Sequence, residues 1–272
     1  MKDTNLRIRS LVAALVLLAL ISMGARAQGG ADGFLSDLHN FRVSNYIALD
    51  AYYRFSGTGD TDTLNEIVQG INSANDSMNS IAGSSSGVLS AEQIEKLNQE
   101  FDKFKNLMRS NSNDVRNQGY PDLRLVSDMA NQALTMNEKA TELYQVAREN
   151  SGTTTTPRVE AARSAAVKMA QMMAKYSVRT NSSVSQTFQG SATETPLDEQ
   201  ARELDALLES VMQGQGSPEL SAAFNNISSK WQFIRGSYIN YNEKNVGFVI
   251  DRYSKGILKG LANAIELLQG NA

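Results

Sequence analysis

Four residues near the end of the chain have the types and spacing of a small-ligand site. Trp231, Arg235, Tyr238 and Tyr241 follow one another at intervals of three or four residues, which places them on one side of a helix. Aromatic walls and one fixed charge are what a ligand site between helices uses to orient its ligand. The same spacing is also typical of core aromatic residues beside a surface arginine, so both interpretations are open.

Two short motifs formally match sites for hydrolysis and for calcium. Residues 83–87, Gly-Ser-Ser-Ser-Gly, fit the nucleophile-elbow pattern, but that pattern needs a strand before it and a histidine base. The single histidine, His39, lies far upstream. Asp60 and Asp62 resemble the start of a calcium loop, yet its twelfth position is Ile71, where a bidentate acid is required. We predict a linker and a helix cap.

Methionine is the one residue type here that could hold a soft metal. Thioethers suit copper(I), but they also fill irregular gaps in helical cores. The chain has no cysteine and one histidine, so few other ligands exist to complete a copper or haem site. We predict core packing and neither metal nor cofactor for the methionines considered, Met129, Met136, Met169, Met172 and Met173.

Neighbouring acids are the remaining candidates for catalysis. Glu203 and Asp205, like Asp198 and Glu199, stand among charged residues without the apolar setting that raises a carboxyl pKa. We expect them on a solvated helix surface. With no nucleophile, base or acid pair in a suitable setting, the sequence predicts that the protein is not an enzyme.

The first 27 residues are typical of a secretory signal peptide. Lys2, Arg7 and Arg9 precede an apolar run over 11–21, and residues 25–27, Ala-Arg-Ala, form a small-x-small cleavage site. The apolar run is short for a membrane span, so we expect no stable span after cleavage. We predict a periplasmic protein of a Gram-negative bacterium, with secretion as the alternative.

The charge of the mature chain limits its partners. Cleavage after residue 27 removes four of the 26 basic and one of the 29 acidic residues, which leaves 22 and 28 and a net charge of −6. A negative surface disfavours nucleic acid and anionic lipid. We therefore expect a small-molecule ligand or a protein partner, and leave a homodimer open.

Apolar residues recur every three to four positions from residue 34 almost to the end, and hardly any stretch alternates with period two. This pattern predicts an all-α fold, an antiparallel helical bundle. A glycine-rich segment at 28–33 and a polar break at 111–119 are expected to lie outside helices. The densest helix, from Arg158 to about Gln189, carries a stripe of Val159, Ala162, Ala166, Met169, Met173 and Tyr176.

The order of helix lengths and breaks in residues 34–149 recurs in 158–269, which indicates an internal duplication. We predict two tandem four-helix units at 28–152 and 153–272, divided by the linker of Gly152 and four threonines. Short connections favour antiparallel neighbours. Two stacked bundles and one long bundle both satisfy this pattern.

Residues 171–175, Gln-Met-Met-Ala-Lys, resemble the Ser-Gln-Arg-Met-Ala-Lys core of the PilJ-type sensor domain of type IV pilus chemotaxis transducers. The later segments 233–235, Phe-Ile-Arg, after Trp231, and 249–254 are similar to that family too. The resemblance implies extracytoplasmic four-helix sensor modules, often in tandem. It adds Gln171 and Lys175 to Trp231, Arg235 and Tyr238 as expected ligand-binding residues.

These observations together predict an exported, non-enzymatic helical module of the PilJ-type sensor kind. It would bind a small ligand or an envelope, pilus or chemosensory protein. The alternative is a secreted or periplasmic structural or effector protein without a small ligand. Helical periodicity identifies buried faces but does not identify a ligand.

Overall fold

The computed structural model describes residues 3–84, 87–152, 155–181, 195–243 and 245–270, with side chains described for residue 30 and from residue 32 onward. Within these ranges the backbone forms eight α-helices and no strand, which confirms the predicted all-α bundle. The helices are α1 (Asp3–Thr58), α2 (Thr61–Gly83), α3 (Ala91–Gln118), α4 (Leu123–Asn150), α5 (Pro157–Thr180), α7 (Leu197–Met212), α8 (Pro218–Ile239) and α9 (Gly247–Gly270).

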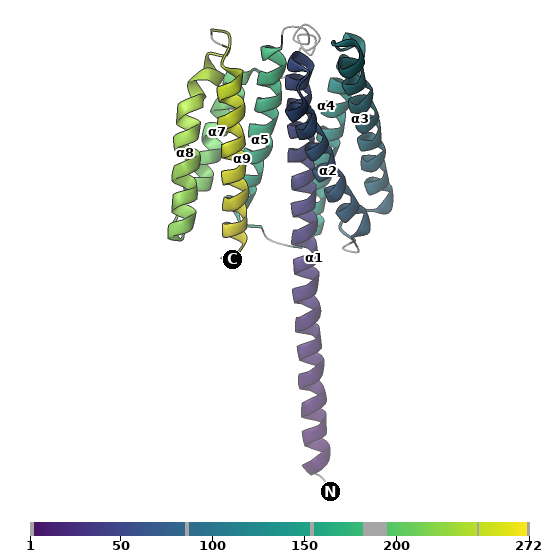
Figure 1. Cartoon of the computed structure of the whole chain (residues 1–272). Helices are drawn as coiled ribbons and strands as arrows, with labels where there is room; N and C mark the ends of the chain where they lie inside the picture. Colours follow the sequence, from purple (N-terminus) through teal and green to yellow (C-terminus); the bar gives the residue numbers. More distant parts are fainter. Residues whose placement is uncertain (1–2, 85–86, 153–154, 182–194, 244, 271–272) are drawn as a thin grey trace.

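Helix α1 is 56 residues long, and its first part projects beyond the other helices (Figure 1). The glycine-rich segment at 28–33 lies inside this helix, so the prediction that it precedes the first helix was wrong. A helical glycine costs only about 1 kcal/mol, which a helix of this length tolerates. The predicted signal peptide falls on residues whose side chains lie outside the described part, and it stays a prediction.

None of the helices in the described part combines the length and the apolar character that crossing a membrane requires.

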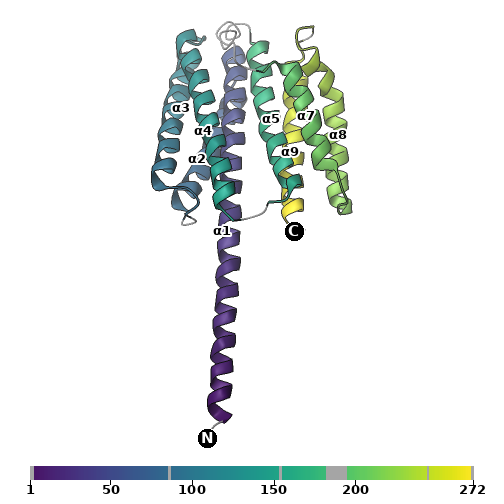
Figure 2. The same ribbon diagram turned by 180° about the vertical axis from the view of Figure 1, so that it is seen from behind.

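The buried apolar side chains form two clusters, and the two groups of helices that surround them lie side by side (Figure 2). Helices α1–α4 surround the first, and α5, α7, α8 and α9 surround the second. The two clusters meet along α1 and α5, because Ala174 and Val178 of α5 belong to the first cluster while Val43 and Ile47 of α1 pack against the second. Since α1 and α5 serve both clusters, the boundary between residues 152 and 153 stays a prediction.

The predicted stripe on α5 is buried along its whole length. Met169, Met172 and Met173 are 0% exposed, which confirms that they fill the core. The helix ends at Thr180 with Asn181 as its C-cap, so the end predicted near Gln189 was wrong. The helix starts as its sequence indicates, with Thr156 as N-cap and Pro157 in the first turn.

Capping side chains set several other helix starts. Ser90 and Gln93 form a capping box at the start of α3. Asp60 caps α2 by accepting a hydrogen bond from the Thr63 backbone N at 2.8 Å. The predicted helix cap at this motif is therefore confirmed, with Asp60 as the cap and Asp62 in the first turn.

The polar break predicted at 111–119 was also wrong, because α3 continues to Gln118 and ends at the left-handed Gly119. Asn111 is fully buried inside this helix. Its amide nitrogen donates to the backbone carbonyl of Leu125 at 3.0 Å, and its amide oxygen accepts from the Tyr52 hydroxyl at 3.4 Å. Partners on neighbouring helices make a buried polar residue compatible with the core.

Candidate functional site

Two of the predicted residues, Trp231 and Arg235, line a groove between α7 and α8. Asp205 of α7 accepts a hydrogen bond from the Trp231 indole Nε1 at 2.8 Å. The same carboxylate binds the Arg235 guanidinium through two nitrogens, Nε at 2.9 Å and Nη2 at 2.7 Å. Asp205 was expected on a solvated helix surface but is half-buried, because Trp231 and Arg235, one turn apart on α8, converge on it.

We call this feature the α7–α8 groove. It has a volume of about 480 Å³, within the range of small-molecule sites. Leu208 and Met212 give it an apolar wall beside Trp231, and Ser228 and Gln232 line it from α8. The groove thus combines apolar walls with a few polar groups.

The Asp205–Arg235 pair sets the electrostatics of the groove. Burial opposes the charged form of Asp205, but the hydrogen bonds from Arg235 and Trp231 outweigh it and lower its pKa. The Asp205 hydrogen bond in turn raises the pKa of Arg235. Both groups are charged at neutral pH and compensate each other, so the pair offers hydrogen-bonding atoms without a net charge.

Tyr238, the third predicted residue on α8, lies in the core and outside the groove. It is fully buried, and its hydroxyl lies 3.0 Å from the Ser254 hydroxyl of α9. Its ring packs edge-on against Tyr176, with 5.5 Å between ring centres. The core-aromatic interpretation therefore describes Tyr238, while Trp231 and Arg235 line the groove.

Gln171 and Lys175 lie on α5 and line a different, much smaller cavity of about 30 Å³. Tyr46 and Leu49 of α1 and Ala133 of α4 also line it. The Lys175 ammonium donates a hydrogen bond to the Thr195 carbonyl at 2.8 Å. The structure therefore does not bring the five predicted residues into one site.

Comparison with protein families, with curated proteins and with solved structures finds no match to this chain. The resemblance to PilJ-type sensor domains stays a prediction.

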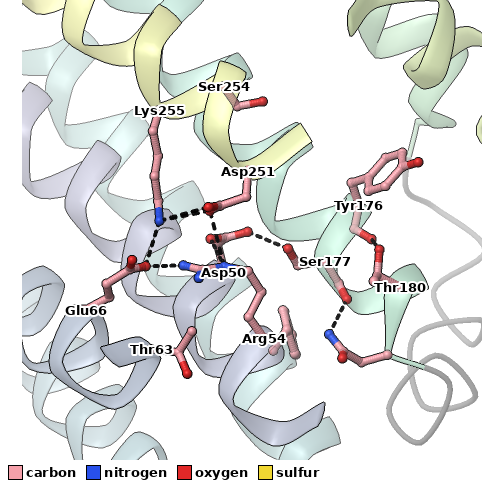
Figure 3. Close-up of polar contacts among 12 residues, drawn as sticks. Asp50, Arg54, Thr63, Glu66, Tyr176, Ser177, Thr180, Asp251, Ser254 and Lys255 are labelled. Atoms are coloured by element: carbon pink, nitrogen blue, oxygen red, sulfur yellow. Dashed lines mark hydrogen bonds and ion pairs between the residues drawn. The ribbon is translucent and has the colours of Figure 1, made fainter. Parts of the chain in front are cut away.

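Sequence reasoning missed a cluster of charged residues between the two groups of helices (Figure 3). Asp50 of α1 is fully buried and accepts a hydrogen bond from the Ser177 hydroxyl of α5 at 2.6 Å. Arg54 Nε lies 3.0 Å from the same carboxylate and 3.3 Å from the Asp251 carboxylate of α9. We call the six residues the polar junction: Asp50, Arg54, Glu66, Ser177, Asp251 and Lys255.

Glu66 of α2 completes the polar junction. It accepts hydrogen bonds from Arg54 and from the Lys255 ammonium, the latter at 2.7 Å. Lys255 also lies 2.9 Å from Asp251, one turn earlier on α9. Three carboxylates, two cations and the Ser177 hydroxyl thus join four helices. The formal charges of these groups leave one excess negative charge.

Burial raises the pKa of Asp50, against the opposing effects of Arg54 and Ser177. Burial also disfavours the charged form of Arg54, but Asp50, Glu66 and Asp251 together raise its pKa. Ser177 has no imidazole base beside it, because His39 lies eleven residues before Asp50 on α1, roughly 16 Å along the axis. The geometry therefore suits the joining of helices and lacks the groups of a serine hydrolase.

A second buried cluster surrounds Arg163 of α5, which is 1% exposed. Its guanidinium donates to the Tyr144 hydroxyl of α4 at 3.0 Å and to the Ser36 hydroxyl of α1 at 2.8 Å. Tyr144 donates to Glu160 at 2.8 Å, and the Arg42 guanidinium lies 4.2 Å from the centre of the Tyr144 ring. This cluster holds α1, α4 and α5 together.

One sequence signal could have identified the polar junction. Asp50 and Arg54, and likewise Asp251 and Lys255, are acid–base pairs four residues apart, beside buried stripes of their helices. Such pairs are usually surface ion pairs, so their spacing alone does not indicate that they meet. In the described part of the chain, no group of three or more histidine or acidic residues is arranged to hold a metal ion.

Proposed function

We propose that this protein is an exported, non-enzymatic helical module of the sensor kind that binds a small ligand in the α7–α8 groove. The observation that supports it is the convergence of Trp231 and Arg235 on Asp205 at the edge of an apolar groove of about 480 Å³. Polar groups fixed in this way orient a ligand, while the apolar wall contributes binding energy.

The paired charges indicate the class of ligand. Asp205 already pairs with Arg235, so a charged ligand that bound one of these two groups would leave the other without its partner. An uncharged ligand can pack an apolar part against Leu208 and Met212 and keep a single hydrogen bond to the rim. We therefore expect an uncharged, mainly apolar compound with one hydrogen-bonding group.

A thermal-shift screen of uncharged compounds against the purified mature chain tests this proposal, since a ligand of the folded state raises its melting temperature. Ser228→Phe fills the groove, and hits should lose their effect in this variant. Ser229→Phe is the matched control, because Ser229 is exposed and its hydroxyl donates a hydrogen bond to the backbone carbonyl of Asn225 on the same helix. A screen without hits, or hits that stabilise the Ser228→Phe protein equally, would contradict the proposal.

A protein partner is the second candidate, and two exposed aromatic side chains favour it. Phe233 of α8 is 62% exposed and Phe248 of α9 is 78% exposed, and exposed aromatic residues often anchor protein interfaces. Crosslinking in intact cells should capture an envelope or pilus protein with the wild type and less of it with a Phe233→Ser, Phe248→Ser double variant. Equal capture by both proteins would exclude this surface.

A further inference from the structure

A second groove lies where α1, α2, α5 and α9 meet. Its volume is about 410 Å³. Val43 of α1, Ala166 of α5 and Leu258 of α9 give it an apolar wall. We call it the four-helix groove, and it is separate from the α7–α8 groove of the proposed function.

One wall of the four-helix groove is polar and comes mainly from α2. Ser73, Asp76 and Ser77 line it from this helix, and Ser44 lines it from α1. Asp76 and Ser77 are adjacent and lie about one turn after Ser73, so the polar atoms of all three residues face the same space. No hydrogen bond or ion pair within the described part of the chain engages these side chains, which leaves one carboxylate and three hydroxyls for a ligand.

His39 lines the groove from α1 and is 6% exposed. Its Nδ1 is buried and has no hydrogen-bond partner among the described residues, a state that is costly unless a bound molecule supplies the partner. Burial, together with Arg42 and Arg163, lowers the His39 pKa well below its usual value. The imidazole is therefore uncharged at neutral pH and does not repel a cation.

Two arginines lie behind His39 and lower its pKa, and each also contacts a partner of its own. Arg163 lies 3.5 Å from Glu160 and 3.6 Å from Asp32, and the Arg42 guanidinium stacks on the Tyr144 ring. Among the residues that line the groove, Asp76 is the one that carries a formal charge. A negatively charged wall beside an uncharged imidazole favours a positively charged ligand.

We propose that the four-helix groove binds a small aliphatic primary amine with a hydroxyl group at its other end. The ammonium would bind the Asp76 carboxylate and the hydroxyls of Ser73 and Ser77, which together match its three donors. The alkyl chain would pack against Val43 and Leu258. The terminal hydroxyl would supply the missing partner of His39 Nδ1.

Proton NMR of the imidazole tests this inference directly, because His39 is the single histidine of the chain and gives one set of imidazole signals. The probe is aminobutanol, with its amino and hydroxyl groups at opposite ends of a butyl chain. At constant pH it should shift the His39 signals saturably, and about fivefold more tightly than the isosteric butanediol, which lacks the charge. Hydroxybutanoate, which has the opposite charge, should bind most weakly.

Asp76→Asn should reduce the affinity for aminobutanol to that for butanediol. Asp62→Asn is the matched control, because Asp62 is an exposed acid on the same helix outside the groove, and it should leave the affinity unchanged. Absence of a saturable shift, equal affinity for the diol, tighter binding of hydroxybutanoate, or unaltered binding by the Asp76→Asn protein would each overturn the inference. These results leave the proposal for the α7–α8 groove untouched, since they concern other residues.

Discussion

The Ser177 hydroxyl of α5 donates a hydrogen bond of 2.6 Å to the fully buried Asp50 carboxylate of α1. These two helices are where the two apolar clusters meet. A short hydrogen bond to a buried carboxylate is among the stronger polar contacts in a protein. The stability of the whole bundle should therefore depend on this pair.

Asp50→Ala should lower the free energy of unfolding by about 3 kcal/mol, because it leaves Arg54 and Ser177 with fewer partners in a buried setting. Urea unfolding of Asp50→Ala, Ser177→Ala and the double variant measures this effect and the coupling, which we expect to be about 1–2 kcal/mol. Asp128→Ala, which removes an exposed pair with Arg124 on α4, is the control and should change stability by less than about 0.5 kcal/mol. Additive losses at Asp50 and Ser177 would contradict the contact.

His39 should make the protein less stable in mild acid. Burial, Arg42 and Arg163 lower its pKa well below the ordinary histidine value of 6.5, so the unfolded chain takes up this proton before the folded protein does. The stability contribution of the neutral imidazole is present above pH 6.5 and is lost as the pH falls toward the folded pKa. Asp50 acts in the opposite direction, because burial raises its pKa and the folded state takes up its proton first.

Comparison of wild type with His39→Gln separates the two effects. The variant lacks the titrating imidazole and keeps Asp50, so its unfolding free energy should fall less steeply between about pH 6.5 and 5. Urea unfolding at a series of pH values measures both slopes. Parallel curves for the two proteins would show that the His39 pKa is not lowered by folding.

Gly70 of α2 allows a close approach to α1. A Cβ at this position would lie 2.9 Å from the Ala48 Cβ and 3.0 Å from the Ala48 backbone nitrogen, so Gly70→Ala must push the helices apart. We expect a loss of about 1–3 kcal/mol. Gly236→Ala on α8 is the matched control: its Cβ meets nothing within 4 Å, and a gain of about 0.5–1 kcal/mol is expected. Thermal unfolding should give opposite signs for the two variants, and a stabilising Gly70→Ala would contradict the close approach.

The proposed export can be tested at the predicted cleavage site. Mass spectrometry of the periplasmic fraction should find a chain that begins at Gln28. Ala25→Phe should block processing, because the site needs a small residue there, whereas Arg26→Ala should be processed normally. A full-length chain in the cytosol would exclude export, and a processed chain found only in the culture medium would favour the secreted alternative.

The sequence predicts the helices well, because apolar spacing reports directly which face of a helix is buried. The stripe on α5 is an example, and it is buried as expected. The break expected at 111–119 failed because the buried polar groups of Asn111 find partners on α1 and α4. Local composition cannot reveal partners that only tertiary packing supplies.

The candidate site was only partly predictable for the same reason. Trp231 and Arg235 were recognisable as residues of one helix face, and they do line one groove. Their partner, Asp205, lies on another helix, 30 residues before Arg235. Tyr238 shares the spacing but is buried in the core, because a step of three residues places its side chain about 60° around the helix from Arg235.

The most direct test of the proposed ligand-binding function is NMR of the Trp231 indole. The chain has one tryptophan, so one indole N–H resonance reports the hydrogen bond to Asp205 at the edge of the α7–α8 groove. We predict that a compound found by thermal shift moves this resonance saturably, with the same Kd as its stabilising effect, and fails to do so in Ser228→Phe. A resonance that stays unchanged while the compound saturates the protein would place the ligand elsewhere and contradict the account.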